Sequence, residues 1–202
     1  MITIAIDLDE VLGGFVEALI LFHNEAYGSF LQTSDFFSYT FREVWGGTEE
    51  ESKKKVNEFF QSRHFDNIKP IEGAHEGVQK LLDSGFQLVV VTSRQTVIER
   101  QTKQWIDANF PNTFSDIRFG NNWSATGTKT SKPDLCRQVG ASFMIDDSLS
   151  YSRQCAEAGF KTLLFDLKGL YRWNQTDSPL PPLVRRVTTW EEAVNAIMDH
   201  YD

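Results

Sequence analysis

Two pairs of acidic residues lie far apart in the sequence, but each pair follows an apolar run, so the two pairs could form one site. Asp7 and Asp9 follow an apolar run over residues 2–6, and Asp146 and Asp147 end a second apolar run. Such runs are typical of buried parallel strands, and ligands bind outside the carboxyl ends of those strands. Four carboxylates gathered there would repel one another and be poorly hydrated, a conflict that a divalent cation resolves. Oxygen ligands of this type favour Mg²⁺, which also takes substrate phosphate oxygens.

Two further features suit the binding of a phosphoryl group. Another apolar run ends in Thr92 and Ser93, where a hydroxyl and backbone N–H groups can hold a phosphoryl oxygen. Lys132 begins the helix predicted before Asp146 and can point into the same crevice as a cation. Taken singly, an Asp-x-Asp turn, a hydroxyl cap and a solvated lysine are ordinary features. The informative observation is the ordered set, with each member at the carboxyl end of a predicted strand.

A sheet must place these residues side by side. Five apolar runs are predicted to be strands, over residues 2–6, 88–91, 117–119, 143–145 and 162–165. Helical patterns lie between them, and a last helix is predicted from the capping box Thr189-x-x-Glu192 to about residue 199. Alternating strands and helices with short loops predict an α/β fold, a Rossmann-like parallel sheet with helices on both faces.

Residues 13–70 interrupt this alternation. Two helices are predicted here, over about 15–27 and 49–62, and the second begins with the capping box Thr48-x-x-Glu51. Residues 13–69 contain twelve of the aromatic side chains, which is enough for an apolar centre of their own. We therefore expect a small helical cap, residues 13–70, inserted into a catalytic core formed by residues 1–12 and 71–202.

The composition disfavours several classes of protein. The 202 residues carry 20 Lys+Arg and 28 Asp+Glu, a net charge of −8 without a basic patch, which disfavours a nucleic-acid polymer as partner. The longest apolar stretch, residues 15–22, contains an acidic residue and is too short to span a membrane. A strand-like run where a signal peptide would stand, and two cysteines in helical patterns, predict a cytoplasmic protein without disulfides.

The ordered set resembles the motifs of the haloacid dehalogenase superfamily. Asp7-Leu8-Asp9-Glu10-Val11 is similar to its first motif, Thr92-Ser93 to its second, Lys132 to its third, and Ile145-Asp146-Asp147-Ser148 to its fourth. The resemblance covers residues 2 to about 166. The long interval between the first and second motifs fits a cap inserted at that place.

This resemblance implies a role for each acidic residue. Asp7 would be the nucleophile that attacks phosphorus to give an aspartyl-phosphate, and Asp9 the general acid that later activates water as a base. Mg²⁺ would be held by Asp7, the backbone carbonyl of Asp9 and Asp146, with Asp147 a ligand or a neighbour of one. Dehalogenases of the superfamily lack a carboxylate two residues after the nucleophile, so Asp9 favours a phosphohydrolase or phosphomutase.

The resemblance also implies how a small-molecule phosphate ester would be held. Thr92 or Ser93, together with Lys132, would bind the transferring phosphoryl group. Lys129 is an alternative for the third-motif lysine, but it lies in a Gly/Thr-rich loop. Lys132 is preferred because a helix N-terminus can aim it.

Within the superfamily, the chain is most similar to the 5′(3′)-deoxyribonucleotidase branch. Phe15 stands where that branch places a phenylalanine against the nucleobase, and Trp45 lies in the stretch that supplies further base contacts. Each of these rings either lines the pocket or packs inside the cap. Arg94, directly after the second motif, either binds substrate or forms a surface salt bridge. The sequence departs from the branch at Glu10, where glycine is common, and at Gly14, where an aspartate is usual.

Three functions remain open at this point. The first is a magnesium-dependent phosphatase of a nucleoside 5′-monophosphate. The second keeps the chemistry but acts on a sugar phosphate or a phosphoglycolate-like acid. The third is a non-catalytic binding member of the fold, which the complete acidic set disfavours because binding alone does not need it.

Overall fold

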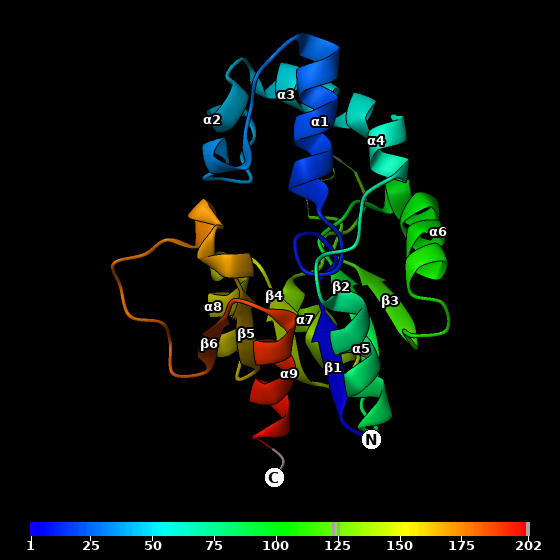
Figure 1. The fold of residues 1–202 in the computed structure, drawn as a ribbon, viewed down its shortest axis with the longest axis vertical. Coiled ribbons are helices and arrows are strands. Elements are labelled where there is room, and N and C mark those ends of the chain that lie inside the picture. The colour runs from blue at the N-terminus through cyan, green and yellow to red at the C-terminus, as the bar shows by residue number, and fades with distance from the viewer. Residues whose placement is uncertain (123, 125, 201–202) are drawn as a thin grey trace.

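The computed structural model describes residues 1–122, 124 and 126–200. Within them, the centre is a six-stranded parallel sheet with strand order β3-β2-β1-β4-β5-β6 (Figure 1). The strands are β1 (Thr3–Ile6), β2 (Gln87–Thr92), β3 (Asp116–Phe119), β4 (Ala141–Asp146), β5 (Lys161–Phe165) and β6 (Val184–Val187). Because β1 pairs with both β2 and β4, the strand order reverses direction at β1, and a crevice opens at such a switch point.

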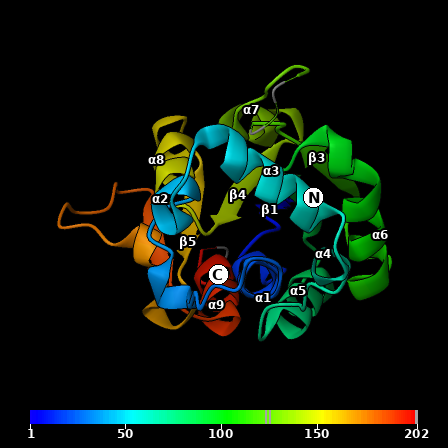
Figure 2. The same cartoon turned by 90° about the horizontal axis from the view of Figure 1, so that it is seen from above.

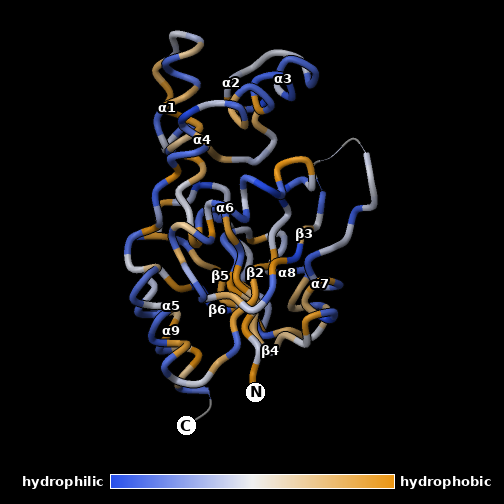
Figure 3. The backbone as a smooth tube through the Cα atoms, turned by 90° about the vertical axis from the view of Figure 1, so that its right-hand side faces the viewer, coloured by the Kyte–Doolittle hydropathy of each residue, from blue (hydrophilic) through white to orange (hydrophobic). Residues whose placement is uncertain are grey.

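Helices cover both faces of the sheet. Ile4 and Ile6 of β1 belong to an apolar cluster with α5 (Ala74–Asp83) and α9 (Trp190–Met198). Ala5, between them, packs on the opposite face, which α7 (Lys132–Gln138) and α8 (Leu149–Glu157) cover. Figure 2 shows these two pairs of helices on either side of the sheet, with α6 (Glu99–Asn109) beside β3. The predicted Rossmann-like architecture is confirmed, and its hydrophobic strands lie in the middle of the molecule (Figure 3).

Strand β6 is absent from the sequence prediction. It pairs with β5 alone, at one edge of the sheet. Val184 and Val187 are buried, but Arg185 between them is exposed. Strand β6 has only four residues, and two of them are arginines, so its sequence lacks the apolar pattern by which a strand is told from a loop. It is recognised as a strand only by its pairing with β5.

The chain between β1 and α5 forms four α-helices, which lie at the carboxyl end of the sheet (Figure 1). They are α1 (Phe15–Tyr27), α2 (Arg42–Trp45), α3 (Glu49–Phe60) and α4 (Arg63–Asp66), with a 3₁₀ turn, η1, at Thr33–Asp35. We call residues 15–66 the helical segment. The Thr48 capping box is confirmed, with both reciprocal hydrogen bonds present. The remaining 3₁₀ turns are η2 (Thr96–Ile98), η3 (Leu167–Gly169) and η4 (Arg172–Asn174).

Aromatic rings fill the interior of the helical segment. Phe59 is fully buried and contacts Phe15, Phe22 and Phe65 at centroid distances of 5.2, 5.6 and 5.4 Å. These rings are not a separate core, because they belong to the same apolar cluster as Ile4 in the sheet. The helical segment is therefore packed continuously onto the sheet that carries the acidic residues.

The junction between β1 and α1 depends on Glu10. Its φ of 61° lies in the left-handed region, which explains why glycine is common here in the related branch. The backbone N–H of Val16 donates to Glu10 Oε1 at 2.6 Å, and this satisfies a helix-end donor that Gly14 leaves without a side-chain cap. Burial raises the pKa of Glu10 to about 7. Glu10 thus adopts a backbone conformation that favours glycine, and its side chain forms a hydrogen bond with the first turn of α1.

Candidate active site

The four carboxylates of the predicted set lie at neighbouring strand ends. Asp7 follows β1 and Asp146 is the last residue of the adjacent strand β4. The backbone N–H of Asp7 donates to the carbonyl of Ile145 at 2.9 Å, which continues the ladder between the two strands. Asp147 comes one residue later, and Asp7, Asp146 and Asp147 are all buried.

Lys132 lies between two of these carboxylates. Its ammonium nitrogen is 2.6 Å from Asp7 Oδ1 and 2.9 Å from Asp146 Oδ2, and it donates to the carbonyl of Val91 at 2.9 Å. Lys132 is the first residue of α7, and its side chain has no exposed surface. Burial alone would lower the pKa of Lys132, but the carboxylates of Asp146 and Asp7 outweigh it and raise the pKa above its ordinary value. Lys129, the alternative, is exposed in the preceding loop.

The acidic cluster has an excess of negative charge. Asp7, Asp146 and Asp147 each offer an oxygen, and these oxygens lie within 4.8 Å of one another. Burial is the main reason that the pKa of Asp7 is raised to about 7 and that the pKa of Asp147 is raised well above its usual range. Three carboxylates beside one lysine suit a hard divalent cation, which would offset their repulsion and lower both pKa values. The residues present therefore fit the binding of Mg²⁺.

Asp9 is paired with Arg94. Arg94 Nε lies 3.1 Å from both carboxylate oxygens of Asp9, and Nη2 lies 2.7 Å from Oδ1. The side chain of Arg94 is only 4% exposed and that of Asp9 is 20% exposed. Of the two alternatives for Arg94, the surface salt bridge is wrong, because the pair with Asp9 forms below the surface. Arg94 does line the cavity above the sheet, where the alternative of substrate binding would place it.

The two hydroxyls of the second motif have different surroundings. The Oγ1 atom of Thr92 accepts the backbone N–H of Arg94 at 3.1 Å, and its side chain is buried at the end of β2. Ser93 lines the cavity above the sheet. Of the two hydroxyl residues expected, together with Lys132, to hold phosphate, Ser93 lines that cavity and Thr92 bonds within the turn after β2.

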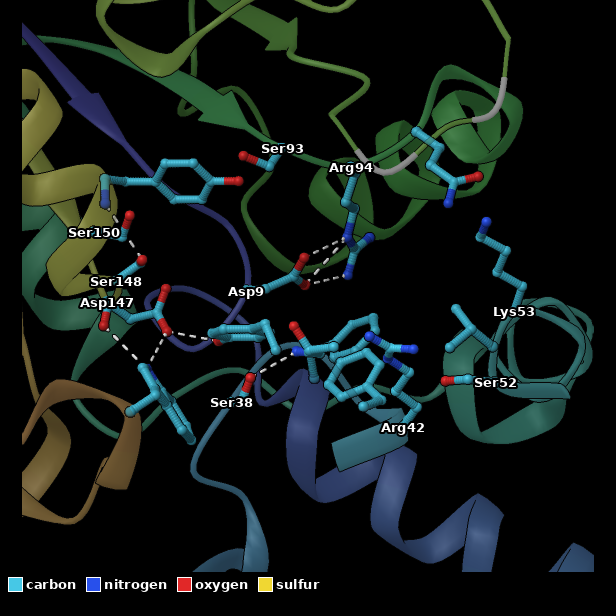
Figure 4. A pocket seen from close by; sticks show the side chains of 18 of the residues that line it. Asp9, Ser38, Arg42, Ser52, Lys53, Ser93, Arg94, Asp147, Ser148 and Ser150 are labelled. Atoms are coloured by element: carbon cyan, nitrogen blue, oxygen red, sulfur yellow. Dashed lines mark hydrogen bonds and ion pairs between the residues drawn. The ribbon is translucent and has the colours of Figure 1, made fainter. Parts of the chain in front are cut away.

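A cavity of about 720 Å³ connects the acidic residues with the helical segment (Figure 4). Asp7, Asp9 and Asp147 line the end nearest the sheet. Aromatic residues contribute much of the remaining wall, among them Phe15, Phe37, Tyr39, Phe41, Phe60, Tyr151 and Trp173. The lining also includes polar side chains that could orient a ligand, namely Ser38, Thr40, Arg42, Ser52, Lys53, Asn57 and Gln95.

Of the two rings expected in the pocket, Phe15 lines the cavity and Trp45 does not. The indole of Trp45 stacks on His23 at 4.8 Å and donates from Nε1 to Ser52 Oγ at 3.2 Å. These contacts keep the ring inside the helical segment. The expectation that Trp45 faces substrate is corrected accordingly.

Two residues of the cavity were not found from the sequence. Tyr39 donates its hydroxyl to Asp147 Oδ2 at 2.6 Å, and Trp173 Nε1 donates to the same oxygen at 3.0 Å. Asn174 Nδ2 also donates to the backbone carbonyl of Asp147 at 2.6 Å. Nothing in the sequence signals these contacts, because Tyr39 lies 108 residues before Asp147 and in a different part of the fold.

Solved structures with this arrangement of sheet and helices are numerous. A HAD family hydrolase from Deinococcus radiodurans R1 with bound phosphate and sodium has a TM-score of 0.69 at 17% identity, covering 98% of this chain and 95% of that chain. The HAD-hydrolase YfnB from Bacillus subtilis bound to magnesium has a TM-score of 0.67 at 16% identity, covering 97% of this chain and 98% of that chain. At these identities the likeness shows the fold alone. No curated protein sequence matches the chain.

The fold and the site together define a hydrolase of the haloacid dehalogenase superfamily. The model of the family described as "5' nucleotidase, deoxy (Pyrimidine), cytosolic type C protein" matches residues 1–199. The chain belongs to this family and is a phosphomonoester hydrolase. Among the residues that the structure describes, no helix has the length and apolar character needed to cross a membrane.

Proposed function

We propose that the protein is a magnesium-dependent phosphatase that hydrolyses nucleoside 5′-monophosphates through an aspartyl-phosphate on Asp7. The observation that carries this proposal is the position of Asp7. It lies 2.6 Å from the buried Lys132 at the end of a cavity of about 720 Å³ whose far walls are largely aromatic. The family description, which names a cytosolic nucleotidase, supports both the substrate class and a cytoplasmic location.

In the first step, a carboxylate oxygen of Asp7 attacks phosphorus and forms an acyl-phosphate bond. The bond from phosphorus to the leaving oxygen breaks, and the carboxyl group of Asp9 gives its proton to that oxygen, so the nucleoside leaves as an alcohol. Lys132 offsets the negative charge of the group being transferred, and Ser93 can donate a hydrogen bond to one of its oxygens.

In the second step, water attacks phosphorus and the bond to Asp7 breaks. Asp9, now ionised, takes one proton of that water, so inorganic phosphate leaves and both aspartates return to their starting forms. When bound at Asp7, the backbone carbonyl of Asp9 and Asp146, with Asp147 a ligand or a neighbour of one, Mg²⁺ would supply positive charge that stabilises the transferring phosphoryl group.

The cavity supports a substrate larger than phosphate alone. A phosphoryl group at Asp7 would leave most of the 720 Å³ to the rest of the ester. Phe15 and Phe41 lie in its wall with ring centroids 6.3 Å apart, and aromatic faces of this kind stack on bases. We propose that residues 13–70 act as a cap that selects the ester and that residues 1–12 and 71–202 form the catalytic core.

A panel of phosphorylated metabolites tests this proposal. Purified protein is assayed for phosphate release from nucleoside 5′-monophosphates, sugar phosphates, phosphoglycolate and 4-nitrophenyl phosphate, with magnesium and with a chelator. We expect nucleotides to give the highest kcat/KM and the chelator to abolish turnover. The Asp7→Asn variant, nearly isosteric, should be folded but inactive by orders of magnitude.

Each other outcome has a defined meaning. Preference for sugar phosphates would replace the nucleotide assignment with the second class of ester. Retained activity of Asp7→Asn would contradict the covalent route. Full activity in chelator would contradict the role of magnesium.

A further inference from the structure

The carboxylate of Asp9 is held asymmetrically by Arg94. Its Oδ1 atom is contacted by both Nη2, at 2.7 Å, and Nε, at 3.1 Å, whereas Oδ2 is contacted only by Nε, at 3.1 Å. Among the described residues, no other hydrogen bond to either carboxylate oxygen of Asp9 is present. Oδ2 is therefore the oxygen of Asp9 with the fewer donors.

Arg94 is itself fixed from several sides. Its Nη1 donates to Thr102 Oγ1 of α6 at 3.1 Å, and its backbone N–H donates to Thr92 Oγ1 at 3.1 Å. The guanidinium lies over the rings of Phe65, at 5.0 Å, and Phe15, at 5.9 Å. A planar guanidinium held in this way has little freedom to rotate, so it constrains any carboxylate that it binds.

This geometry is compatible with both proton states of Asp9. A proton carried on Oδ2 leaves Oδ1 free to accept from Nη2, so the strongest contact persists when the carboxyl group is neutral. Loss of that proton restores the two-oxygen contact that the structure shows. Arg94 can therefore keep Asp9 in one orientation through proton donation and proton uptake.

We propose that Arg94 is the positioning residue of Asp9, and that it makes Oδ2 the atom that transfers the proton. Arg94 also lines the cavity, but its Nε and Nη2 donate to Asp9 and its Nη1 donates to Thr102. Its effect on the reaction would therefore pass through the orientation of Asp9. This role rests on the proposed function, because it concerns the step in which the leaving oxygen is protonated. A misplacement of about 1 Å at such a group can cost about 10²-fold in rate.

The test compares two leaving groups. The first step is measured in single turnovers as release of 4-nitrophenolate, which needs no proton, and of nucleoside from a 5′-monophosphate, which does. We expect Arg94→Gln to slow nucleoside release about 10²-fold and nitrophenolate release by less than tenfold. Arg94→Lys keeps the charge and the buried stem but loses the two-oxygen contact, so it should show the same selectivity. If Arg94→Gln does not fold, the lysine variant decides the question.

A double-mutant cycle separates positioning from a merely structural role. In an Asp9→Asn background, Arg94→Gln should cost less than about threefold in nucleoside release, because the group that it orients no longer transfers a proton. The matched control is Arg118→Gln, which removes an exposed arginine–aspartate pair on β3 and should leave all rates unchanged.

The inference is overturned if Arg94→Gln slows both leaving groups equally, slows neither, or costs as much in the Asp9→Asn background as in the wild type. Failure of the proposed function has a different signature. A wild-type protein that releases no phosphate from any ester would overturn that function before a variant is compared.

Discussion

The hydroxyl of Tyr39 in the helical segment donates a 2.6 Å hydrogen bond to Asp147 in the acidic cluster. It is a direct polar contact between the segment that borders the cavity and the residues that we expect to hold metal. The ring of Tyr39 also lies against that of Trp173, at 5.2 Å, and Trp173 donates to the same carboxylate oxygen. The helical segment is thus bonded to the carboxyl end of the sheet.

Tyr39→Phe removes this hydrogen bond and keeps the ring. A hydrogen bond contributes about 0.5–1.5 kcal/mol to stability, so we expect unfolding in urea at a lower midpoint. The KM for a nucleotide should rise, because the wall of the cavity is no longer held to Asp147. Tyr27→Phe is the control, since that hydroxyl bonds Glu58 on the exposed surface of the same segment. Equal effects of the two variants on KM would contradict the role given to Tyr39.

Lys132→Met should destabilise the protein strongly. Removing a buried partner leaves Asp7 and Asp146 without their ammonium group, at a cost of about 3–5 kcal/mol. We expect the melting temperature to fall and magnesium to raise it more in the variant than in the wild type. Lys103→Met, which removes an exposed pair with Glu99, should change stability by less than about 0.5 kcal/mol. A variant as stable as the wild type without magnesium would show that the carboxylates do not repel one another as argued.

Phe15→Leu tests whether the cavity selects a base. Phe15 lines the cavity and also packs edge-on against Phe59, so leucine is preferred to alanine, which would leave a larger void. Loss of one base–aromatic stack should cost about 1–3 kcal/mol, seen as a rise in KM of roughly 5- to 150-fold for nucleotides. Hydrolysis of acetyl phosphate should be almost unchanged. A folded variant that loses both activities to the same extent would exclude stacking on Phe15.

The left-handed backbone of Glu10 predicts an ordering of two variants. Glu10→Ala loses the carboxylate that accepts from Val16 and retains the unfavourable φ that the wild type already has, so the lost hydrogen bond destabilises it without compensation. Glu10→Gly loses the same hydrogen bond but relieves about 1 kcal/mol of backbone strain. We expect the free energy of unfolding to decrease in the order wild type, Glu10→Gly, Glu10→Ala. An alanine variant more stable than the glycine variant would contradict the argument from strain.

The buried His23 predicts how stability depends on pH. Burial, reinforced by Lys55 at 3.1 Å, lowers the pKa of His23 to about 4. Because the unfolded chain has the ordinary value of about 6.5 and binds the proton more readily, stability falls as pH decreases from 6.5 to 4. Urea unfolding of the wild type and His23→Gln at several pH values isolates this contribution. We expect a smaller loss in the variant; parallel curves would show that folding does not lower the pKa of His23.

The acidic chemistry could be predicted because it depends on local order along the chain. Asp7 and Asp146 each end an apolar run, and parallel strands bring such ends to one edge whatever the connections between them. Helix α3 begins after Thr48 as predicted, since its capping box is complete within four residues. By contrast, β6 has no local signal, because it exists only through pairing with β5.

The surroundings of the same residues were decided by tertiary packing. Sequence placed Arg94 beside the second motif, but only the folded chain shows that its donors meet Asp9, 85 residues away. Tyr39 reaches Asp147 over 108 residues, while Trp45, in the same aromatic stretch, packs on His23 instead. Helices can pack on a sheet in many arrangements that bury the same apolar area. The sequence therefore does not decide which aromatic ring faces the cavity. The sequence therefore determined which groups could react, and the tertiary structure determined which residues hold and enclose them.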